Sequence, residues 1–367
     1  MNYKTMKSNN SFVLKFAIAF TLVLILMLCN VVVNNTEVEA SSRSGQIIME
    51  RDSNRVLYQD NANEKMYMAS TTKIVTCLVV IENCNMSDII TVSNDTVGAE
   101  GSSIYLEVGE KLSVKDLLYG LMLRSGNDCA ETLAVHCSGS IEKFAELMNI
   151  TAKRIGAVNS NFTNPHGLHD DNHYTTAYDL ALISCYAMKN DTFREIVSTK
   201  SIDIPFTTRN YNRHLVNKNK MLKEFEGSTG IKTGYTKKAG RCLVSSCVRD
   251  GMELICVVLN CPPMFERSKE LLTKTFSSYK LYNLLDCDNI VGFIFNTKNN
   301  KKIAIYIKDD VVLPLTQHEI KNIKIEYDYP NSIDYTVKKD QEIGSVKIYC
   351  ENNLIFQQKI YTIIGVD

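Results

Sequence analysis

The sequence predicts an α/β (α+β) protein, in which a domain with an antiparallel sheet and a helical cluster is followed by a small all-β sandwich domain. Three observations carry this prediction. Strand-like patterns stand at both ends of residues 44–282, and apolar residues with helical spacing fill the middle. From about residue 286 only short strand patterns remain, separated by polar turns. The chain has 367 residues, 45% of them hydrophobic, which is enough for two domains with a real core.

The elements follow from hydrophobic periodicity and from capping residues. Apolar spacing predicts a helix that begins at Ser70, and Ser113-x-x-Asp116 is a capping box before another helix. The expected elements of the first domain are a hairpin at 44–58, helices at 70–82, 117–123, 127–134, 141–155 and 176–187, strands at 231–233, 241–248 and 253–259, and a closing helix at 267–282. In the second domain, strands are expected at 290–295, 303–307, 323–327, 346–349 and 355–363.

The N-terminus has the pattern of an export signal. A lysine-bearing stretch at residues 1–15 precedes an apolar run, Phe16 to Cys29, that is short for a membrane span. Val38-Glu39-Ala40 then offers small residues at the outer and inner positions of a cleavage site, so we expect cleavage after residue 40. An uncleaved anchor that uses Val31 to Val33 to complete a span is the alternative. Both interpretations put the rest of the chain outside the cytoplasm.

Charge and cysteine content exclude several classes of protein. Basic and acidic residues number 41 each, and no basic stripe suggests a nucleic-acid partner. Twelve cysteines in an exported chain would normally suggest disulfides. Loss of Cys29 with the signal would leave an odd number, however, and several of the others lie in apolar runs. We therefore expect buried thiols, and no cysteine or histidine spacing of a zinc site is present.

Three short motifs follow one another in the order Ser-x-x-Lys, Ser-x-Asn and Lys-Thr-Gly. The first is Ser70-Thr-Thr-Lys73, whose serine and lysine share one helical face. A serine hydroxyl becomes a good nucleophile when a base takes its proton, and a lysine can be that base if burial or a nearby cation lowers its pKa. Lys232 could supply that cation. Without the other motifs, the pair would read as an N-cap and a solvated lysine.

The second motif is Ser125-Gly-Asn127, between two predicted helices. One interpretation is a turn with an N-cap, which these residue types suit. In the functional interpretation, Ser125 relays a proton between Lys73 and a leaving amine, and Asn127 holds either that lysine or a substrate amide. Asp128 is expected to be a first-turn helix acid.

The third motif is Lys232-Thr233-Gly234, on a predicted strand. Lys232 and Thr233 can bind a carboxylate by charge and by hydroxyl, and Gly234 leaves room for a substrate backbone along the strand. An exposed lysine and a turn glycine are the alternative. Strict strand alternation would send Lys232 and Thr233 to opposite faces, so how both reach one ligand is left open.

Three histidines, His166, His169 and His173, lie close together in a loop. A metal site is conceivable, but the loop contains proline and glycine and lacks a helical i, i+4 histidine pair. We expect surface or hydrogen-bonding histidines, and neither a metal nor another cofactor.

The motifs and their extended contexts resemble those of serine-type D-alanyl-D-alanine carboxypeptidases, the low-molecular-weight penicillin-binding proteins. The similarity runs from about residue 44 to residue 282. It rests on these segments: Ala69–Lys73, Leu117–Asn127, Asn164–Leu168, Tyr174–Asp179 and Gly230–Gly234. The resemblance implies a β-lactamase/transpeptidase-like first domain and fits the small β domain as well.

The resemblance also implies roles for matching residues. Ser70 would be the acylated nucleophile, Lys73 its base and Ser125 the third catalytic residue, with Asn127 beside it. Lys232 and Thr233 would bind the terminal carboxylate of D-Ala-D-Ala, and Gly234 would border it. The N–H groups of Ser70 and Tyr235 would form the oxyanion hole. Many relatives carry histidine at position 235, which affects side-chain contacts more than this N–H.

The resemblance implies peptidoglycan stem pentapeptides as substrate and β-lactams as covalent inhibitors. We expect a signal peptide at 1–40, a catalytic domain at 41–285 and a C-terminal β-sandwich domain at 286–367. The location would be the cell wall or the outer face of a bacterial membrane. The chain's end lacks the basic amphipathic helix of many relatives, so no membrane anchor is clear after cleavage.

Two alternatives remain. A β-lactamase shares the three motifs, but the class with an acidic deacylation base needs a glutamate that Asn161–Pro165 lacks. A non-catalytic wall-binding or penicillin-sensing module is the other alternative, although it would be expected to have lost one of the motifs, and all three are intact.

Overall fold

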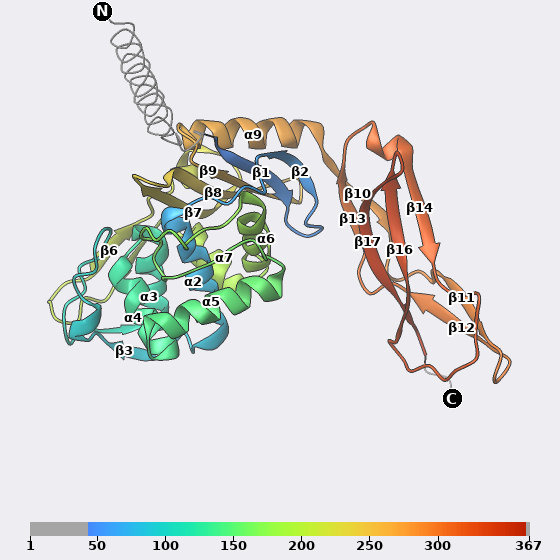
Figure 1. Cartoon of the computed structure of the whole chain (residues 1–367), viewed down its shortest axis with the longest axis horizontal. Helices are drawn as coiled ribbons and strands as arrows, with labels where there is room; N and C mark the ends of the chain where they lie inside the picture. The colour runs from blue at the N-terminus through green and yellow to red at the C-terminus, as the bar shows by residue number, and fades with distance from the viewer. Residues whose placement is uncertain (1–42, 365–367) are drawn as a thin grey trace, which may run out of the picture. The chain divides into compact units, whose positions relative to one another are not determined.

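The structure is a computed structural model that describes residues 43–364. Its larger domain is built on a five-stranded antiparallel sheet in the order β2-β1-β9-β8-β7, which leaves β7 at one edge (Figure 1). The strands are β1 Gly45–Glu50, β2 Val56–Asp60, β7 Ser228–Thr236, β8 Gly240–Arg249 and β9 Met252–Leu259.

Most of the helices come from the stretch between β2 and β7. They are η1 Ala69–Thr72, α2 Lys73–Asn83, α3 Val114–Tyr119, η3 Gly120–Arg124, α4 Asn127–Ser138, α5 Ile141–Ile155, α6 Ala177–Ala187, α7 Asp191–Ser198 and α8 Met221–Glu224, with α9 Met264–Ser278 after the sheet. Two small hairpins accompany them: β3 Ile89–Thr91 with β4 Lys111–Ser113, and β5 Ser201–Ile204 with β6 Arg213–Val216.

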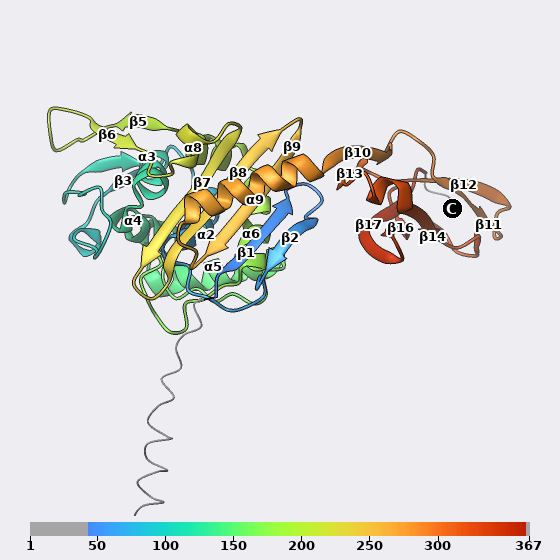
Figure 2. The ribbon, with the colours of Figure 1, turned by 90° about the horizontal axis from the view of Figure 1, so that it is seen from above.

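The sheet is covered on both faces, and strand alternation explains how. Along β1, Ile47 and Met49 belong to the core under the helical cluster, whereas Ile48 belongs to the core under α9. Figures 1 and 2 show α9 along one face of the sheet and the main helical cluster beyond the opposite face, whereas the short helix α8 contributes Met221 to the core under α9. All six residues of β1 are buried, because apolar layers lie on either side of the strand.

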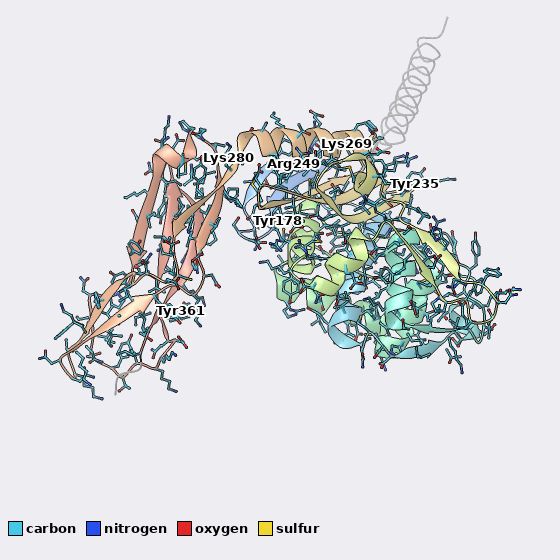
Figure 3. All side chains as sticks on the ribbon, turned by 180° about the vertical axis from the view of Figure 1, so that it is seen from behind. Tyr178, Tyr235, Arg249, Lys269, Lys280 and Tyr361 are labelled. Carbon is cyan, nitrogen blue, oxygen red and sulfur yellow. The ribbon has the colours of Figure 1, made fainter. Side chains whose placement is uncertain are left out.

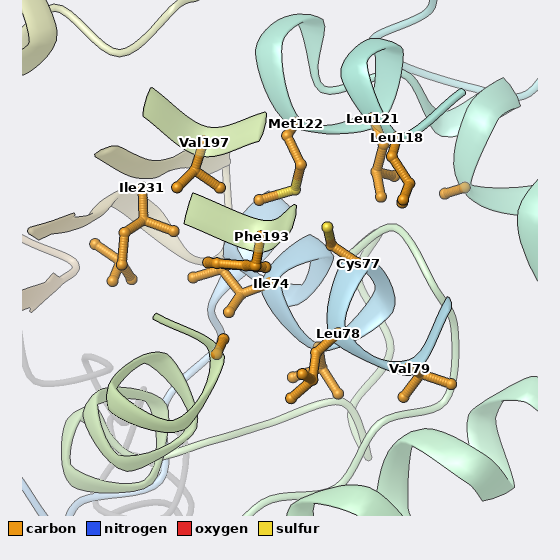
Figure 4. Packing of buried hydrophobic residues seen from close by; sticks show 14 of the residues in the cluster. Ile74, Cys77, Leu78, Val79, Leu118, Leu121, Met122, Phe193, Val197 and Ile231 are labelled. Atoms are coloured by element: carbon orange, nitrogen blue, oxygen red, sulfur yellow. The ribbon is translucent and has the colours of Figure 1, made fainter. Parts of the chain in front are cut away.

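Helix α2 runs through the middle of the helical cluster. Its apolar residues Ile74, Cys77 and Leu78 are at most 1% exposed. Figure 4 shows Ile74 close to Phe193 of α7, with Val197 of α7 facing Ile231 of β7. This packing joins the start of α2 to the edge strand, so the first turn of α2 is held between helices and sheet.

The C-terminal domain is all β and has a core of its own. A six-stranded sheet runs β14-β16-β17-β12-β11-β15, and a two-stranded sheet pairs β10 with β13. The strands are β10 Lys280–Leu285, β11 Gly292–Asn296, β12 Lys301–Tyr306, β13 Val311–Leu315, β14 Ile323–Asp328, β15 Ser332–Ile333, β16 Glu342–Cys350 and β17 Asn353–Thr362. Ile294, Ile305 and Ile348 are fully buried in this core.

Most expected elements are present, with several differences. The closing helix ends at Ser278, and residues 280–285 form a strand that pairs with 311–315 instead of extending the helix. The predicted helix that begins at Ser70 starts as the 3-10 turn η1. The β3–β4 and β5–β6 hairpins, α7, α8, β13 and β15 were not expected; α7 was missed although Phe193, Ile196 and Val197 have helical spacing, because the segment is only two turns long.

The predicted signal segment and its cleavage site lie outside the described residues. Within residues 43–364, no helix is long and apolar enough to cross a bilayer. The eleven cysteines of this stretch are free thiols. Burial raises the pKa of Cys242 and Cys256 to about 12, which keeps both thiols protonated and unreactive.

Candidate active site

Ser70 and Lys73 lie at the junction of η1 and α2. The ammonium nitrogen of Lys73 donates to Ser70 Oγ at 3.3 Å, to Asn127 Oδ1 at 2.7 Å and to the carbonyl oxygen of His166 at 2.7 Å. The Lys73 side chain is fully buried. The structure therefore brings the first motif into contact with the second motif and with the histidine loop.

Burial and a neighbouring cation act together on Lys73. Desolvation is the largest cause that holds the pKa of Lys73 well below its usual value, and the charge of Lys232 is the next. Asp128 and Cys129 oppose this shift. A lysine whose pKa is lowered in this way can stay neutral near neutral pH and accept a proton from the adjacent Ser70 hydroxyl.

Ser125 and Asn127 do not act as helix caps. The N-cap of α4 is Gly126, without a side-chain cap bond, and Ser125 is buried in the left-handed region at φ +66°. Ser125 Oγ has no hydrogen-bond partner among the described residues. A buried hydroxyl without a partner is costly, which favours a role that is completed by substrate.

Asn127 is held by one side-chain and one backbone hydrogen bond. Its Nδ2 donates to the carbonyl of Glu100, and its backbone N–H donates to the carbonyl of Ser102 at 2.6 Å. This leaves Oδ1 to accept from Lys73. The orientation of the Asn127 side chain is thus fixed by the loop at residues 100–102.

Asp128 is more than a first-turn helix acid. Its fully buried carboxylate accepts hydrogen bonds from the backbone N–H groups of Ile104 and Leu106 and from the Ser103 hydroxyl. It therefore ties the loop that orients Asn127 to the start of α4.

The third motif lies on the edge strand β7, next to η1. A Cβ atom added at Gly234 would lie 2.9 Å from the carbonyl oxygen of Met68 and 3.1 Å from the backbone nitrogen of Ser70. Only a glycine allows the strand to approach the nucleophile this closely. Tyr235 follows and is 59% exposed at the surface (Figure 3).

Lys232 is buried beside this edge, and its Nζ donates to the carbonyl oxygen of Thr233 at 3.1 Å. Burial lowers the pKa of Lys232 to about 7, with the charge of Lys218 as the second cause. Thr233 is partly exposed. The two side chains thus differ in environment, as strand alternation requires, and the burial of Lys232 rules out the alternative of an exposed strand lysine.

Lys218 was not singled out in the sequence. Its charge contributes to lowering the pKa of both Lys73 and Lys232, and its Nζ donates to Ser102 Oγ at 3.3 Å. The residue stands in a polar stretch without a motif, so only the fold reveals it as a third cation of the site.

The histidine loop supports the site through hydrogen bonds. The carbonyl oxygen of His166 accepts a hydrogen bond from Lys73 Nζ. The ring of His173 is hydrogen-bonded to the hydroxyl of Thr72, on the turn that carries Ser70. His169 is partly exposed and packs its ring edge-to-face on Tyr67 at 4.7 Å between centroids. Across residues 43–364 no group of three potential metal ligands comes together.

A serine beside a buried lysine, a second serine and a strand edge with a lysine form the arrangement expected of an active-serine enzyme in which a lysine is the base. The comparison with protein families identifies the family. Residues 30–262 match the family model for D-alanyl-D-alanine carboxypeptidase, and residues 279–366 match the model for the penicillin-binding protein 5 C-terminal domain. The chain belongs to the D-alanyl-D-alanine carboxypeptidase family and is a peptidase.

Individual relatives agree over most of the chain. The D-alanyl-D-alanine carboxypeptidase DacF of Bacillus subtilis is 31% identical over 333 residues, which cover 88% of this chain and 85% of the relative. The enzyme of Streptomyces sp. strain K15 is 35% identical over 231 residues, 59% of this chain and 79% of the relative. The structure of penicillin-binding protein 5 from Haemophilus influenzae superposes with a TM-score of 0.77 at 27% identity, covering 88% of this chain and 96% of that one.

Proposed function

We propose that this carboxypeptidase removes the terminal D-alanine from peptidoglycan stem pentapeptides through an acyl-enzyme on Ser70. One observation carries the proposal: the amine of the buried Lys73 lies 3.3 Å from Ser70 Oγ, with its pKa lowered well below the usual value. That arrangement suits a base that takes the serine proton.

In acylation, neutral Lys73 accepts the hydroxyl proton while Ser70 Oγ forms a bond to the carbonyl carbon of the D-Ala-D-Ala amide. The negative charge that develops on the carbonyl oxygen is received by the backbone N–H groups of Ser70 and Tyr235. Gly234 supports this, since a side chain there would meet the Ser70 nitrogen.

The leaving D-alanine then needs a proton on its nitrogen. Ser125 is suited to pass one from protonated Lys73, because its buried Oγ lacks a partner among the described residues. The C–N bond breaks and D-alanine departs. A water molecule next attacks the ester, and its proton returns through the same basic group, which frees Ser70 Oγ.

The free carboxylate of the terminal D-alanine is the feature that marks this substrate. Lys232, in its protonated form, and the Thr233 hydroxyl would bind it, with Lys218 adding positive potential. This requirement for a terminal carboxylate accounts for action on the end of a peptide.

A β-lactam offers the same carboxylate next to a reactive amide, so it would acylate Ser70 and leave slowly. We further infer that residues 1–40 are a cleaved signal, that the catalytic domain begins at residue 41 and is followed by a β-sandwich domain that includes β10 as well as residues 286–367, and that the enzyme acts outside the cytoplasm. The pattern of charge and apolar residues at the N-terminus supports the export.

The proposal is tested by release of D-alanine from a diacyl-Lys-D-Ala-D-Ala tripeptide and by mass spectrometry after exposure to penicillin. We expect steady D-alanine release and one slowly lost adduct on Ser70. Ser70→Ala should abolish both. An adduct on another residue, or intact tripeptide after long incubation, would refute the assignment, and rapid turnover of penicillin would favour a β-lactamase.

A further inference from the structure

A chain of buried hydrogen bonds leads from the histidine loop to the residue before the nucleophile. The backbone N–H of Thr163 donates to His173 Nδ1 at 3.0 Å. His173 Nε2 lies 2.8 Å from Thr72 Oγ1, and that hydroxyl donates to the carbonyl oxygen of Ala69 at 2.8 Å. Thr72 is fully buried, and His173 is only 2% exposed.

The directions of these bonds are set by the first of them. Because His173 Nδ1 accepts from Thr163, the proton of the neutral ring is on Nε2. That N–H then donates to Thr72, whose own hydroxyl proton is already given to Ala69. The three bonds form one continuous chain of donors and acceptors, with no alternative orientation that satisfies all of them.

The chain ends on a backbone segment that would not adopt its conformation unaided. Ala69 has φ +48°, in the left-handed region that a residue with a Cβ atom disfavours. Gly167 closes over the same carbonyl, since a Cβ atom there would lie 2.0 Å from the Ala69 oxygen. The strained turn is therefore enclosed by the histidine loop and bonded to it.

The carbonyl of Ala69 and the N–H of Ser70 belong to one peptide unit. That unit is planar and trans, so its C=O and N–H point in opposite directions. Fixing the carbonyl toward Thr72 therefore fixes the N–H away from it. Gly234 lies on the side of the Ser70 nitrogen. Because it has no side chain, the space next to this nitrogen stays open for a substrate.

We propose that His173 is a positioning residue which, through Thr72, sets the Ala69–Ser70 peptide plane and thereby aims the oxyanion-hole N–H of Ser70. The inference rests on the proposed function, because it assigns this N–H to the developing oxyanion. The hydrogen-bond partners of the His173 ring are Thr163 and Thr72, and neither is the nucleophile or its base, so the ring acts through Thr72.

The ring of His173 is suited to this constant role. Burial lowers the pKa of His173 to about 4, with the nearby charge of His166 as the second cause. Lys73 and His169 act in the same direction, and Asp170 opposes them. The ring therefore stays neutral over the working pH range, and the Nδ1 acceptor and Nε2 donor persist.

The test separates the acylation rate constant for penicillin from the dissociation constant of the preceding non-covalent complex, using stopped-flow measurements on the full chain. His173→Ala should lower the rate constant about 10- to 100-fold, while the dissociation constant changes less than about twofold, because only the transition state bears the oxyanion. His173→Gln should recover most of the loss, since an amide can accept from Thr163 and donate to Thr72.

Thr72→Val removes the middle link with little change in shape and should give the same loss. The double variant His173→Ala/Thr72→Val should be no slower than either single variant, because both break one chain. His169→Ala, from the same loop, is the matched control and should acylate at the wild-type rate.

Several results would overturn the inference. They are a His173→Ala rate constant within twofold of wild type, equal losses in the alanine and glutamine variants, or multiplicative losses in the double variant. A fall in thermal stability in proportion to the rate loss would also count against it, since it would indicate a packing role alone. If wild-type protein itself gives no Ser70 adduct, the proposed function fails, which is a distinct outcome.

Discussion

Three lysines share one cleft, and the environment gives each a different task. Lys73 is fully buried among hydrogen-bond acceptors, with its pKa lowered most strongly by desolvation. Lys232 has a pKa of about 7 and lies at the strand edge. Lys218 is exposed, and partial desolvation of its amine and the charge of Arg124 lower its own pKa. In the proposed mechanism Lys73 must be neutral as the base and Lys232 charged as the carboxylate-binding group, so the rate requires opposite protonation states of the two lysines.

Lys218→Gln should move the whole bell-shaped pH profile of kcat/KM to higher pH. Removal of its positive charge raises the pKa of Lys73, so this base becomes neutral only at higher pH and the acid limb moves to higher pH. The same change raises the pKa of Lys232, which then stays charged to higher pH, so the alkaline limb also moves to higher pH. Tripeptide hydrolysis measured from pH 5 to pH 10 checks this.

Arg124→Gln is the control for that profile, since the charge of Arg124 lowers the pKa of Lys218 but is not among the causes that lower the pKa of Lys73 or Lys232. Its profile should move less than that of Lys218→Gln. Limbs that stay in place in Lys218→Gln would show that the charge at position 218 is screened from the cleft.

At the scale of elements, the turn at residues 164–167 determines how closely the histidine loop approaches η1. Gly167 has φ +86°, and a side chain there would run into the Ala69 carbonyl and the Thr72 hydroxyl. The sequence predicted a loop with proline and glycine at these residues. It did not indicate that the turn covers the residue before the nucleophile, because that contact joins segments about a hundred residues apart.

Gly167→Ala should therefore reduce both stability and acylation. A left-handed alanine costs roughly 1 kcal/mol, and the clash with backbone adds to that cost because Ala69 cannot move freely. Gly109→Ala is the matched control: it has φ +83°, but no atom lies within 4 Å of the added Cβ. Thermal melts should show a loss of stability from backbone strain in both variants. Penicillin acylation rates should fall only in Gly167→Ala.

An unchanged acylation rate in Gly167→Ala would mean that the turn can retreat from Ala69 at no functional cost.

The positions of most helices and strands were predictable because apolar periodicity and caps are local signals. The end of α9 was predicted wrongly. Residues 280–285 keep an apolar pattern after the helix, and pairing with β13, a non-local contact, decides that they form a strand.

At the scale of the whole molecule, the chain has separate hydrophobic cores. The two cores on either side of the first sheet draw on residues from 47 to 281, and the core of the β domain on residues from 282 to 360. These clusters have no residue in common. Each domain therefore has its own apolar stabilisation, which is the usual condition for independent unfolding.

Calorimetry should accordingly resolve two thermal transitions. Acylation by penicillin should raise only the transition of the catalytic domain, because the adduct adds contacts in that cleft. Ile348→Ala, at a fully buried position of the β domain, should lower only the other transition, by roughly 2–5 kcal/mol of unfolding free energy. One transition that responds as a unit to both changes would contradict independent domains.

The sequence by itself predicted the family and the α/β class, and three ordered motifs with extended contexts singled out the serine, the lysines and the strand glycine of the candidate site. These signals are local, since helix and strand periods fix which neighbours share a face. Tertiary structure alone decided the convergence of Lys73 with Asn127 and His166, 54 and 93 positions away. It also decided the contributions of Lys218 and His173, because burial, charge proximity and contacts across the chain arise only when distant segments pack together.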